Sequence, residues 1–426
     1  MPLSTIARLE SGHTPSRRVP DYWDGDIPWI GIRDATENHG RTIARTVQSV
    51  TQAGIDNSSA RILPAGTVCL SRTASVGYVV VMGRPMATSQ DFVNWVCTEA
   101  IDHNFLRYVL LSEHESMLRF ASGTTHQTIY YPEAKAFHIC LPSIGEQHAI
   151  AHILGTLDDK IELNRRMNET LEEIARTLFK SWFVDFSPVH AKAEGQDSGL
   201  PKPLADFFPD SFKGSELREI PEGWGICAVY DLAEYINGGA YRAFEPNEER
   251  RGLPIVKIAE LKAGVTAQTR FSDVEMPRKF RIDSGDILFS WSGNPDTSID
   301  TFVWSHGPAW LNQHIFRVVP HSANERSFVL ATLRYFRPQF TEIARNKQTT
   351  GLGHVTVEDL KRLRTVRPHG SILSAWSANV DPLHARAFGL DLENQTLSTL
   401  RSTLLAKLIS GELRIKDAER VAAHAL

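Results

Sequence analysis

The most regular pattern of apolar positions in the chain is a heptad repeat between residues 145 and 186. Such a repeat predicts a coiled-coil helix, and a helix of about 41 residues would be about 60 Å long, so it needs a second helix beside it. Ser143 and Glu146 have the spacing of a capping box at its N-terminus. Alternating steps of four and three residues from Ile150 give the seam positions, which face the second helix: Leu154, Leu157, Ile161, Asn164, Asn168, Leu171, Ala175, Leu178 and Trp182.

A second amphipathic stretch near the C-terminus repeats this pattern. Asn394 follows Asn168 by 226 residues (394 − 168). Asp381 and Pro382 predict the N-cap and the first residue of this second helix. We predict an antiparallel helix pair about a pseudo-two-fold axis, in which Asn168 faces Asn394 and fixes the register; the alternative is that both asparagines face water. The same offset of 226 gives the other seam positions, which are Leu383, Leu390, Leu397, Leu404 and Leu408.

The segments before each long helix also repeat. The offset drifts by a few residues inside the repeat and returns to 226 at the helix, which is typical of insertions in loops. The matched positions include Gln90 with Gln313 and His126 with His354. The matched segments are 26–34 with 252–260, 63–71 with 282–290, 87–95 with 310–318, and 123–129 with 351–357.

Each globular repeat combines strand and helix signals. Short β-branched runs around polar turns predict hairpins at residues 67–82 and 286–304, and residues 105–120 and 328–345 have helical patterns. We therefore predict a mixed α/β (α+β) fold with two tandem globular domains separated by two long helices. The predicted segments are a first domain at 1–142, a central helix at 143–186, an ordered connector at 187–224, a second domain at 225–370, and a distal helix with a C-terminal tail at 371–426.

Composition places the chain among ordinary globular proteins, with 42% hydrophobic and 23% charged residues. No apolar run approaches the roughly 18 to 20 residues of a membrane helix, and the four cysteines are far apart, so we expect a cytoplasmic protein without a membrane partner. The net charge of −4 argues against a simple nucleic-acid coat protein. Residues 326–367 nevertheless carry nine Lys and Arg against three Asp and Glu, which is either a nucleic-acid patch or a solvated basic face.

The motifs of common enzymes are missing. No glycine precedes a lysine, so a phosphate-binding loop cannot be written, and no GxGxxG fingerprint occurs. His148 and His152 are four residues apart, but Ala149 stands where a zinc protease needs Glu and a third ligand is not evident. Glu260 and Lys262 have the spacing of the ExK part of a PD…ExK nuclease motif, but no Pro-Asp lies at a suitable distance upstream. We predict no catalytic residue, no metal and no cofactor bound by this chain itself.

Two polar, glycine-containing loops occur in each repeat, at 71–77 and 122–128 and at 291–297 and 346–354. Their side chains are of the kinds that address base edges and phosphates, and glycine permits close backbone approach. One polar loop is a weak signal, but two matched pairs favour DNA binding. The predicted DNA-contacting residues are Arg72, Thr73, Ser75, Ser122, Thr124, Thr125, His126 and Gln127 in the first repeat, and Trp291, Asn294, Lys347, Gln348, Thr349 and His354 in the second.

Three stretches carry a family resemblance. Residues 11–34 resemble the opening of a target recognition domain in the specificity subunits of type I restriction–modification systems. Residues 123–192 resemble the end of that domain and the central region of the same family, and IPEGW at 220–224 fits the start of a second recognition domain. The resemblance covers essentially the whole chain.

This resemblance implies a non-catalytic subunit of a phage-defence complex. Each recognition domain would read one half of a split site in double-stranded DNA, and the helix pair would set the gap. The helices would dock two methyltransferase subunits, which bring S-adenosylmethionine, and motor-nuclease subunits using ATP and Mg²⁺ would join them. The alternatives are a protein-binding adaptor on a coiled-coil pair and a free-standing enzyme, which the missing motifs disfavour.

Overall fold

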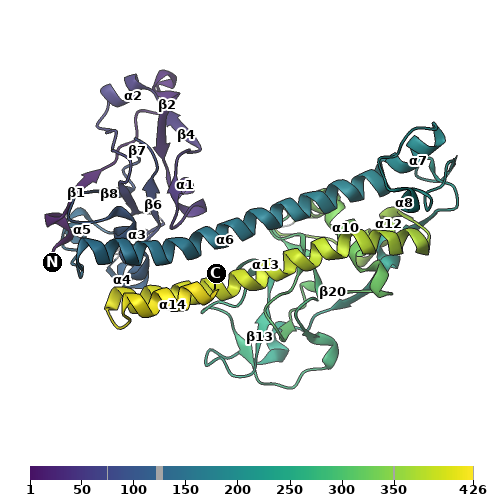
Figure 1. Cartoon of the computed structure of the whole chain (residues 1–426). Helices are drawn as coiled ribbons and strands as arrows, with labels where there is room; N and C mark the ends of the chain where they lie inside the picture. Colours follow the sequence, from purple (N-terminus) through teal and green to yellow (C-terminus); the bar gives the residue numbers. More distant parts are fainter. Residues whose placement is uncertain (74, 121–127, 349–350, 426) are drawn as a thin grey trace. The chain divides into compact units, whose positions relative to one another are not determined.

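The computed structural model describes residues 1–73, 75–120, 128–348 and 351–425 (Figure 1). The chain divides into two compact units, the first comprising Met1–Glu162 with Thr396–Leu426 and the second comprising Leu163–Gln395. The long helices α6 (Ile144–Phe179) and α13 (Gly370–Ser410) each contribute one part to either unit. Each unit therefore contains one globular domain and a stretch of both helices.

The first unit contains a five-stranded sheet in the order β1-β8-β5-β6-β3 and a three-stranded sheet in the order β4-β2-β7. Helix α3 packs on the larger sheet, and the smaller sheet projects away from α6 (Figure 1). The strands are β1 (Ala7–Ser11), β2 (Trp23–Ile30), β3 (Thr42–Ile43), β4 (Gln48–Val50), β5 (Val68–Ser71), β6 (Val79–Met82), β7 (Ala87–Thr88) and β8 (Phe92–Cys97). The helices are α1 (Ile32–Glu37), α2 (Gln52–Asp56), α3 (His103–Ser112), α4 (His114–Phe120), α5 (Tyr131–Lys135) and α14 (Ile415–Ala425).

The first predicted hairpin is confirmed, because β5 and β6 pair antiparallel with Val68 opposite Val81. Side chains alternate across a strand, so these continuous apolar runs serve two cores. Val68 and Val81 pack in the core that includes α3 and α6, whereas Cys69 and Val80 pack on the opposite face. A run that is buried on both faces needs no polar alternation, which is why the hairpin appears in the sequence as unbroken apolar stretches.

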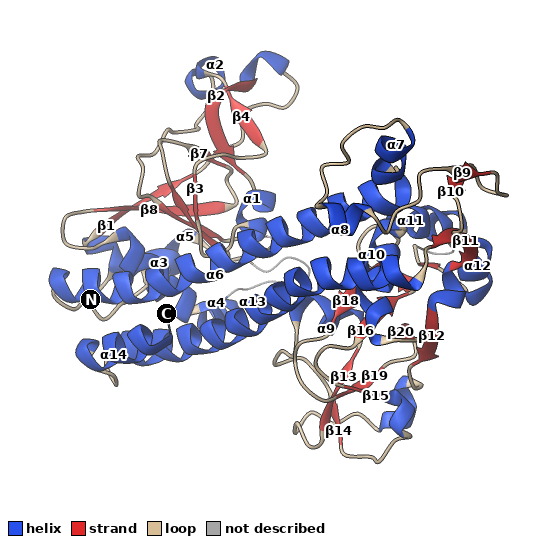
Figure 2. Cartoon of the chain, turned by 45° about the vertical axis from the view of Figure 1, so that its right-hand side comes forward, coloured by secondary structure: helices blue, strands red, loops and turns tan. Residues whose placement is uncertain are grey.

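The second unit repeats this topology and confirms the tandem repeat. Its sheets have the orders β12-β20-β16-β18 and β14-β13-β19-β15, and the second predicted hairpin is β16 with β18. The parallel pair β2 with β7 recurs as β13 with β19. The sheet that contains β13 lies farther from α13 than the sheet that contains β20 (Figure 2). The strands are β12 (Ala233–Asn237), β13 (Leu253–Val256), β14 (Phe271–Ser272), β15 (Arg281–Ile282), β16 (Ile287–Ser290), β18 (Asp300–Val303), β19 (Ala309–Leu311) and β20 (Ile315–Pro320).

The remaining elements of the second unit complete the domain and the connector. Each helical pattern predicted from the sequence corresponds to two consecutive helices, α3 and α4 in the first unit and α10 and α11 in the second. Pro338 lies in the first turn of α11, where its missing N–H costs no hydrogen bond. These elements are α7 (Ser187–Ala193), α8 (Lys202–Ala205), α9 (Ile258–Ala263), α10 (Arg326–Tyr335), α11 (Arg337–Asn346), α12 (Val357–Arg362), β9 (Phe212–Lys213), β10 (Ile220–Pro221), β11 (Gly225–Ala228), β17 (Ser292–Gly293), β21 (Gly353–His354) and β22 (Arg364–Arg367).

The long helices run antiparallel, as predicted, but in a different register. Asn164 Nδ2 donates to Asn394 Oδ1 at 3.0 Å, and Asn168 Nδ2 donates to Asp391 Oδ1 at 2.6 Å. The predicted pairing of Asn168 with Asn394 is therefore wrong. Asn168 and Asn394 are equivalent positions in the two repeats. In an antiparallel helix pair, equivalent positions need not be in contact. Asn164, which is buried, is the residue that Asn394 contacts.

Burial along the seam differs between positions. Leu154, Leu157, Ile161, Leu397, Leu404 and Leu408 are buried in the first unit, and Trp182 and Leu390 are buried in the second. Asn168, Leu171, Leu178, Leu383 and Asn394 are only partly buried.

The predicted start of the second long helix at Asp381 and Pro382 is also wrong. Helix α13 begins at Gly370, and Pro382 lies in its interior although a proline there removes one backbone hydrogen bond. The extra turns bury Ile372, Leu373, Trp376 and Val380. Trp376 contacts the rings of Phe179, Trp182 and Phe183 at centroid distances of 5.9, 5.6 and 5.0 Å. Burial of these side chains favours helix despite the proline.

The two ends of α6 differ. The capping box is confirmed, because the Ser143 N–H donates to the Glu146 carboxylate at 2.9 Å. Hydrogen bonds from Ser143 lower the pKa of Glu146. At the other end the helix changes to a π-helical turn at Lys180–Val184 instead of continuing to residue 186. Among the described residues, no helix has the length and apolar character needed to cross a membrane.

Candidate nucleic-acid interface

Thr128, the last residue of the second loop predicted in the first repeat, lies against the first loop at one end of the larger sheet. Thr73 and Thr128 form an isolated antiparallel bridge, and the Ile129 N–H donates to the Arg72 carbonyl at 2.9 Å. Ser75 follows Thr73 in the first of these loops, and its carbonyl accepts from the buried Ser71 hydroxyl. The predicted residues Ser122, Thr124, Thr125, His126 and Gln127 lie outside the described residues.

A third loop, residues 88–91, joins this site although the sequence did not assign it. The Arg72 backbone N–H donates to the Asp91 carbonyl at 2.7 Å, and Arg72 Nε donates to the Gln90 carbonyl at 3.1 Å. The Gln90 side chain is exposed. The repeated glutamine was visible in the sequence, but its place between the other loops follows only from the tertiary structure.

The segment after β1 supplies a fourth part of the site. The His13 N–H donates to the Thr88 carbonyl at 2.9 Å. At Gly12 a Cβ atom would lie 2.0 Å from the Ser89 carbonyl oxygen, so the close approach of the two backbones requires glycine. The Thr14 hydroxyl donates to the Gln90 side-chain carbonyl.

Arg17 lies beside this segment and is exposed; it is not among the residues predicted from the sequence to contact DNA. Its guanidinium lies over the rings of Trp23 and Trp29, 4.6 and 5.5 Å from their centroids, and donates to Gln48 at 3.2 Å. Trp29 Nε1 in turn donates to the His13 carbonyl at 3.1 Å. Stacking on two indoles holds the charge in place while leaving it open to an anion such as a DNA phosphate.

The second unit brings together the equivalent loops through the same two backbone hydrogen bonds. Trp291 occupies the place of Arg72: its N–H donates to the His314 carbonyl at 3.3 Å, and its carbonyl accepts from the Val355 N–H at 2.8 Å. Strands β17 and β21 then pair Ser292 with His354. Trp291 Nε1 donates to Asn237 Oδ1 at 3.3 Å, so the indole is attached to the end of β12.

Two other predicted residues in the second unit have structural roles. Lys347 Nζ lies 2.5 and 2.7 Å from the two carboxylate oxygens of Asp359. Burial raises the pKa of Asp359, but the hydrogen bonds from Lys347 and Thr356 outweigh it, so that the pKa is lowered overall. The Asn294 side chain accepts from two backbone N–H groups of its own turn at 3.0 and 3.2 Å. Gln348 is exposed, and Thr349 lies outside the described residues.

Seven of the nine basic residues in the stretch 326–367 form ion pairs, five of them with acidic residues outside the stretch. Such pairing leaves fewer open charges for a polyanion than the sequence count indicates, and it supports the alternative of a solvated basic face. The ion pairs are Arg334 with Glu172, Arg337 with Asp300, Arg345 with Asp296, Lys347 with Asp359, Lys361 with Glu358, Arg364 with Glu216, and Arg367 with Glu325.

Comparison with known proteins identifies the family. The model of the type I restriction modification DNA specificity domain matches residues 1–173 and 221–368. The chain belongs to this family. The two matched segments begin in the two globular repeats and together cover most of the chain, so each repeat is one specificity domain.

Relatives with specificity-subunit names cover most of the chain. It is 27% identical to the type I restriction enzyme MjaIX specificity subunit of Methanocaldococcus jannaschii, covering 97% of this chain and 93% of that protein. It is 25% identical to the HindI specificity subunit of Haemophilus influenzae over 72% of this chain and 77% of that one. The crystal structure of the S subunit of a type I restriction-modification system from M. genitalium has the same fold, with a TM-score of 0.54, 16% identity, and coverage of 96% of this chain and 95% of that one.

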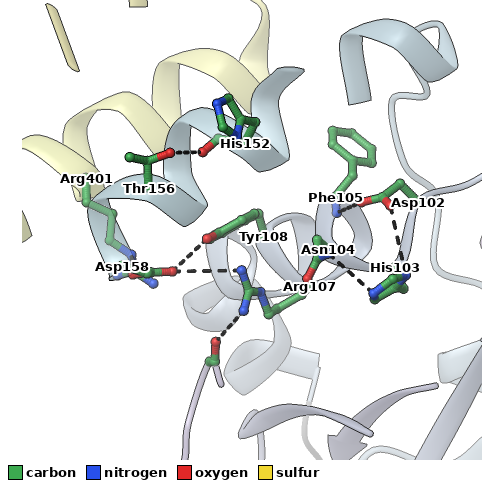
Figure 3. Close-up of polar contacts among 11 residues, drawn as sticks. Asp102, His103, Asn104, Phe105, Arg107, Tyr108, His152, Thr156, Asp158 and Arg401 are labelled. Carbon is green, nitrogen blue, oxygen red and sulfur yellow. Dashed lines mark hydrogen bonds and ion pairs between the residues drawn. The ribbon is translucent and has the colours of Figure 1, made fainter. Parts of the chain in front are cut away.

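The first specificity domain is attached to the long helices by a polar cluster (Figure 3). Tyr108 of α3 donates to Asp158 of α6 at 2.6 Å, and Arg401 Nε of α13 lies 2.5 Å from the other oxygen of the same carboxylate. Arg107 is 3.9 Å from Asp158 and donates to the Gly40 carbonyl at 3.2 Å. Burial raises the pKa of Tyr108, which therefore remains a protonated donor at neutral pH.

The equivalent place in the second specificity domain is a groove of 1150 Å³. The starts of α3 and α10 and the repeat of the long helices match Tyr108 with Ala331, Asp158 with His384, and Arg401 with Ala175. All three replacements line the groove, and two of them are alanines. Burial, followed by the charge of Arg334, lowers the pKa of His384 to about 4, so the imidazole is neutral at neutral pH.

Proposed function

We propose that this protein is the DNA-recognition subunit of a type I restriction–modification complex and reads a bipartite site with one half-site per specificity domain. The observation that carries the proposal is the duplicated loop site. In both domains the residue after β5 or β16 forms the same two backbone hydrogen bonds to two other loops. One scaffold that presents different side chains at equivalent loops suits two readers with different sequence preferences.

The two sites differ in chemistry. Arg72 in the first domain is replaced by Trp291 in the second, and the first site has Arg17 beside it. A guanidinium addresses guanine edges or phosphates, whereas an indole offers apolar surface and one N–H donor. Two half-sites of unlike sequence follow from this difference.

The long helices are proposed to dock two methyltransferase subunits, which bring S-adenosylmethionine, and motor-nuclease subunits that use ATP and Mg²⁺ complete the complex. This chain supplies no catalytic residue and binds no cofactor in the proposal. The helix pair uses one face of each helix for its own seam, which leaves the outer faces for partners. Shared phosphate contacts in such a complex would offset the net charge of −4.

The proposal is tested by co-expressing the chain with its methyltransferase subunit in a host without other DNA methylation, followed by sequencing that detects modified bases. The expected result is a split motif with a constant gap. An unsplit motif would mean that one domain alone reads DNA. No methylation by a complex that assembles would instead favour a protein-binding adaptor.

The helix pair as a ruler is tested by inserting four residues, about one turn, into both α6 and α13. Readers on one face of the duplex lie about one helical turn (34–36 Å) or a multiple apart, so the gap should change while both half-sites keep their sequence. Insertion into both helices keeps their lengths matched. An altered half-site would contradict the ruler.

A further inference from the structure

Gln90 and Gln313 occupy the same place in the two specificity domains. Both stand on the short loop before the last strand of the larger sheet, two residues ahead of β8 and β20. Gln313 follows Gln90 by 223 residues (313 − 90), the offset that also relates the first residues of these strands. Each glutamine is next to a residue whose carbonyl accepts from the central loop residue, Arg72 or Trp291.

The backbone carrying each glutamine is held by a glycine contact of the same kind. In the first domain a Cβ on Gly12 would lie 2.0 Å from the Ser89 carbonyl, and in the second a Cβ on Gly238 would lie 2.2 Å from the Asn312 carbonyl. Ser89 and Asn312, the residues just before the glutamines, are both buried. A buried residue directly before the exposed Gln90 and the half-exposed Gln313 fixes the position of each glutamine Cα at the surface.

The amides themselves are oriented by different neighbours. The Thr14 hydroxyl donates to the Gln90 side-chain oxygen. The residue that matches Thr14 in the second domain is Ala240, which has no hydroxyl, and Gln313 Nε2 lies instead 3.4 Å from the His314 ring nitrogen Nε2. Gln90 is thus pre-oriented by a hydroxyl from another segment, and Gln313 by the next residue in its own loop.

We infer that Gln90 and Gln313 are equivalent base-reading residues, each addressing one adenine edge in the half-site of its own domain. A glutamine amide has a donor and an acceptor side by side and pairs in bidentate fashion with adenine N7 and N6 in the major groove. Thr14 acts as a positioning residue for Gln90. The inference rests on the proposed function and deepens it.

The test compares methylation motifs of complexes containing Gln90→Ala, Gln313→Ala and a control, Gln196→Ala, whose exposed side chain lies in the connector. Each of the first two variants should lose discrimination at one base pair of one half-site, by about 5- to 150-fold, and the two variants should affect different half-sites. Gln196→Ala should leave the motif unchanged. Assembly with the methyltransferase subunit is checked for every variant.

A second measurement keeps the inference falsifiable if a variant assembles poorly. Binding of the complex to an oligonucleotide carrying the wild-type motif, and to one with the adenine pair replaced, gives a discrimination ratio that does not depend on yield. Thr14→Val should reduce this ratio in the first half-site only, and Thr14→Ser should restore it. A split wild-type motif with unchanged ratios in Gln90→Ala and Gln313→Ala would overturn the inference but not the proposed function; an unsplit wild-type motif would overturn both.

Discussion

The two specificity domains differ at one matched contact with the long helices. In the first unit Asp158 accepts a hydrogen bond from Tyr108 and forms an ion pair with Arg401, beside the apolar core that α3 shares with α6. In the second unit the matching residues leave a groove, and the helix ends nearby bury a cluster of rings around Trp376 and Phe183. The order β1-β8-β5-β6 recurs as β12-β20-β16-β18, and the backbone hydrogen bonds of the loops recur as well.

The repeat therefore preserves the backbone geometry of the loops, whereas the side chains that contact the long helices differ between the two domains. A polar cluster depends on a few directed bonds, each of which contributes about 1–3 kcal/mol when charge is involved. An aromatic cluster is stabilised by burial of apolar surface, which is non-directional and proportional to the area removed from water.

The largest effect is expected from Trp376→Ala. Trp376 is fully buried and contacts three other rings, so its loss should reduce the free energy of unfolding by about 3–5 kcal/mol. Urea denaturation followed by far-ultraviolet circular dichroism measures the change. The matched control is Ile150→Ala, the equivalent residue in the first unit, for which a smaller loss is expected because less side chain is removed. An equal or larger loss at Ile150 would contradict the comparison.

The next effect concerns pH and His384. Its pKa of about 4 in the folded protein lies below the ordinary value of 6.5, so between these values the unfolded chain binds a proton that the folded chain does not. Stability therefore falls as pH decreases from 6.5 to 4, by up to about 3 kcal/mol. Arg334 and Arg326 oppose protonation of this histidine, and Asp381 favours it.

His384→Gln should remove this part of the pH dependence, measured as the melting temperature at several pH values. His39 in the first unit, whose pKa is also lowered to about 4 by burial and by His114, contributes with the same sign and remains in the variant. The slope should fall further in the double variant His39→Gln with His384→Gln, and His306, whose pKa is also lowered by burial, contributes to the remainder. An unchanged slope in His384→Gln would show that the imidazole already titrates as in water.

The smallest effect is expected at the polar cluster. Asp158→Ala removes the carboxylate that accepts from Tyr108 and pairs with Arg401, and it should reduce the free energy of unfolding by about 1–3 kcal/mol. Tyr108→Phe should account for about 1 kcal/mol of this loss. Arg33→Ala, which breaks an exposed ion pair with Glu37 in the same unit, is the control and should leave stability unchanged. A loss at Asp158 no larger than that at Arg33 would mean that packing alone attaches this domain.

Much of the fold was predictable because its signals are periodic. The capping box, both hairpins, the tandem repeat and the antiparallel helix pair follow from local patterns that a single sequence displays. The start of α13 was not predictable from the sequence. Pro382 is a strong local signal against helix, and the burial of Trp376 that overrides it is a tertiary contact. The Asn164 and Asn394 contact was missed because antiparallel register depends on the packing of both helices at once.

The candidate site was predictable only in outline. The sequence indicated the loops containing Arg72 and Trp291, and the structure brings each of them against the loop with which it was paired. Lys347 is a predicted DNA contact, and the structure adds that its ammonium group pairs with Asp359, 12 residues away, which no local pattern singles out. Gln90 and Arg17 were not predicted as site residues, because the neighbours that place them in the site come from other segments of the chain.

The periodic and repeated patterns of the sequence are sufficient to predict the architecture: two copies of one domain, a long helix after each, and polar loops at equivalent places. These features depend on residue type and spacing along the chain, which the sequence states directly. Tertiary contacts determine which loops meet, which charges are already paired, and how each domain contacts the helices. Those properties depend on contacts between residues far apart in the chain, such as Arg401 with Asp158, and their geometry exists only once the chain has folded.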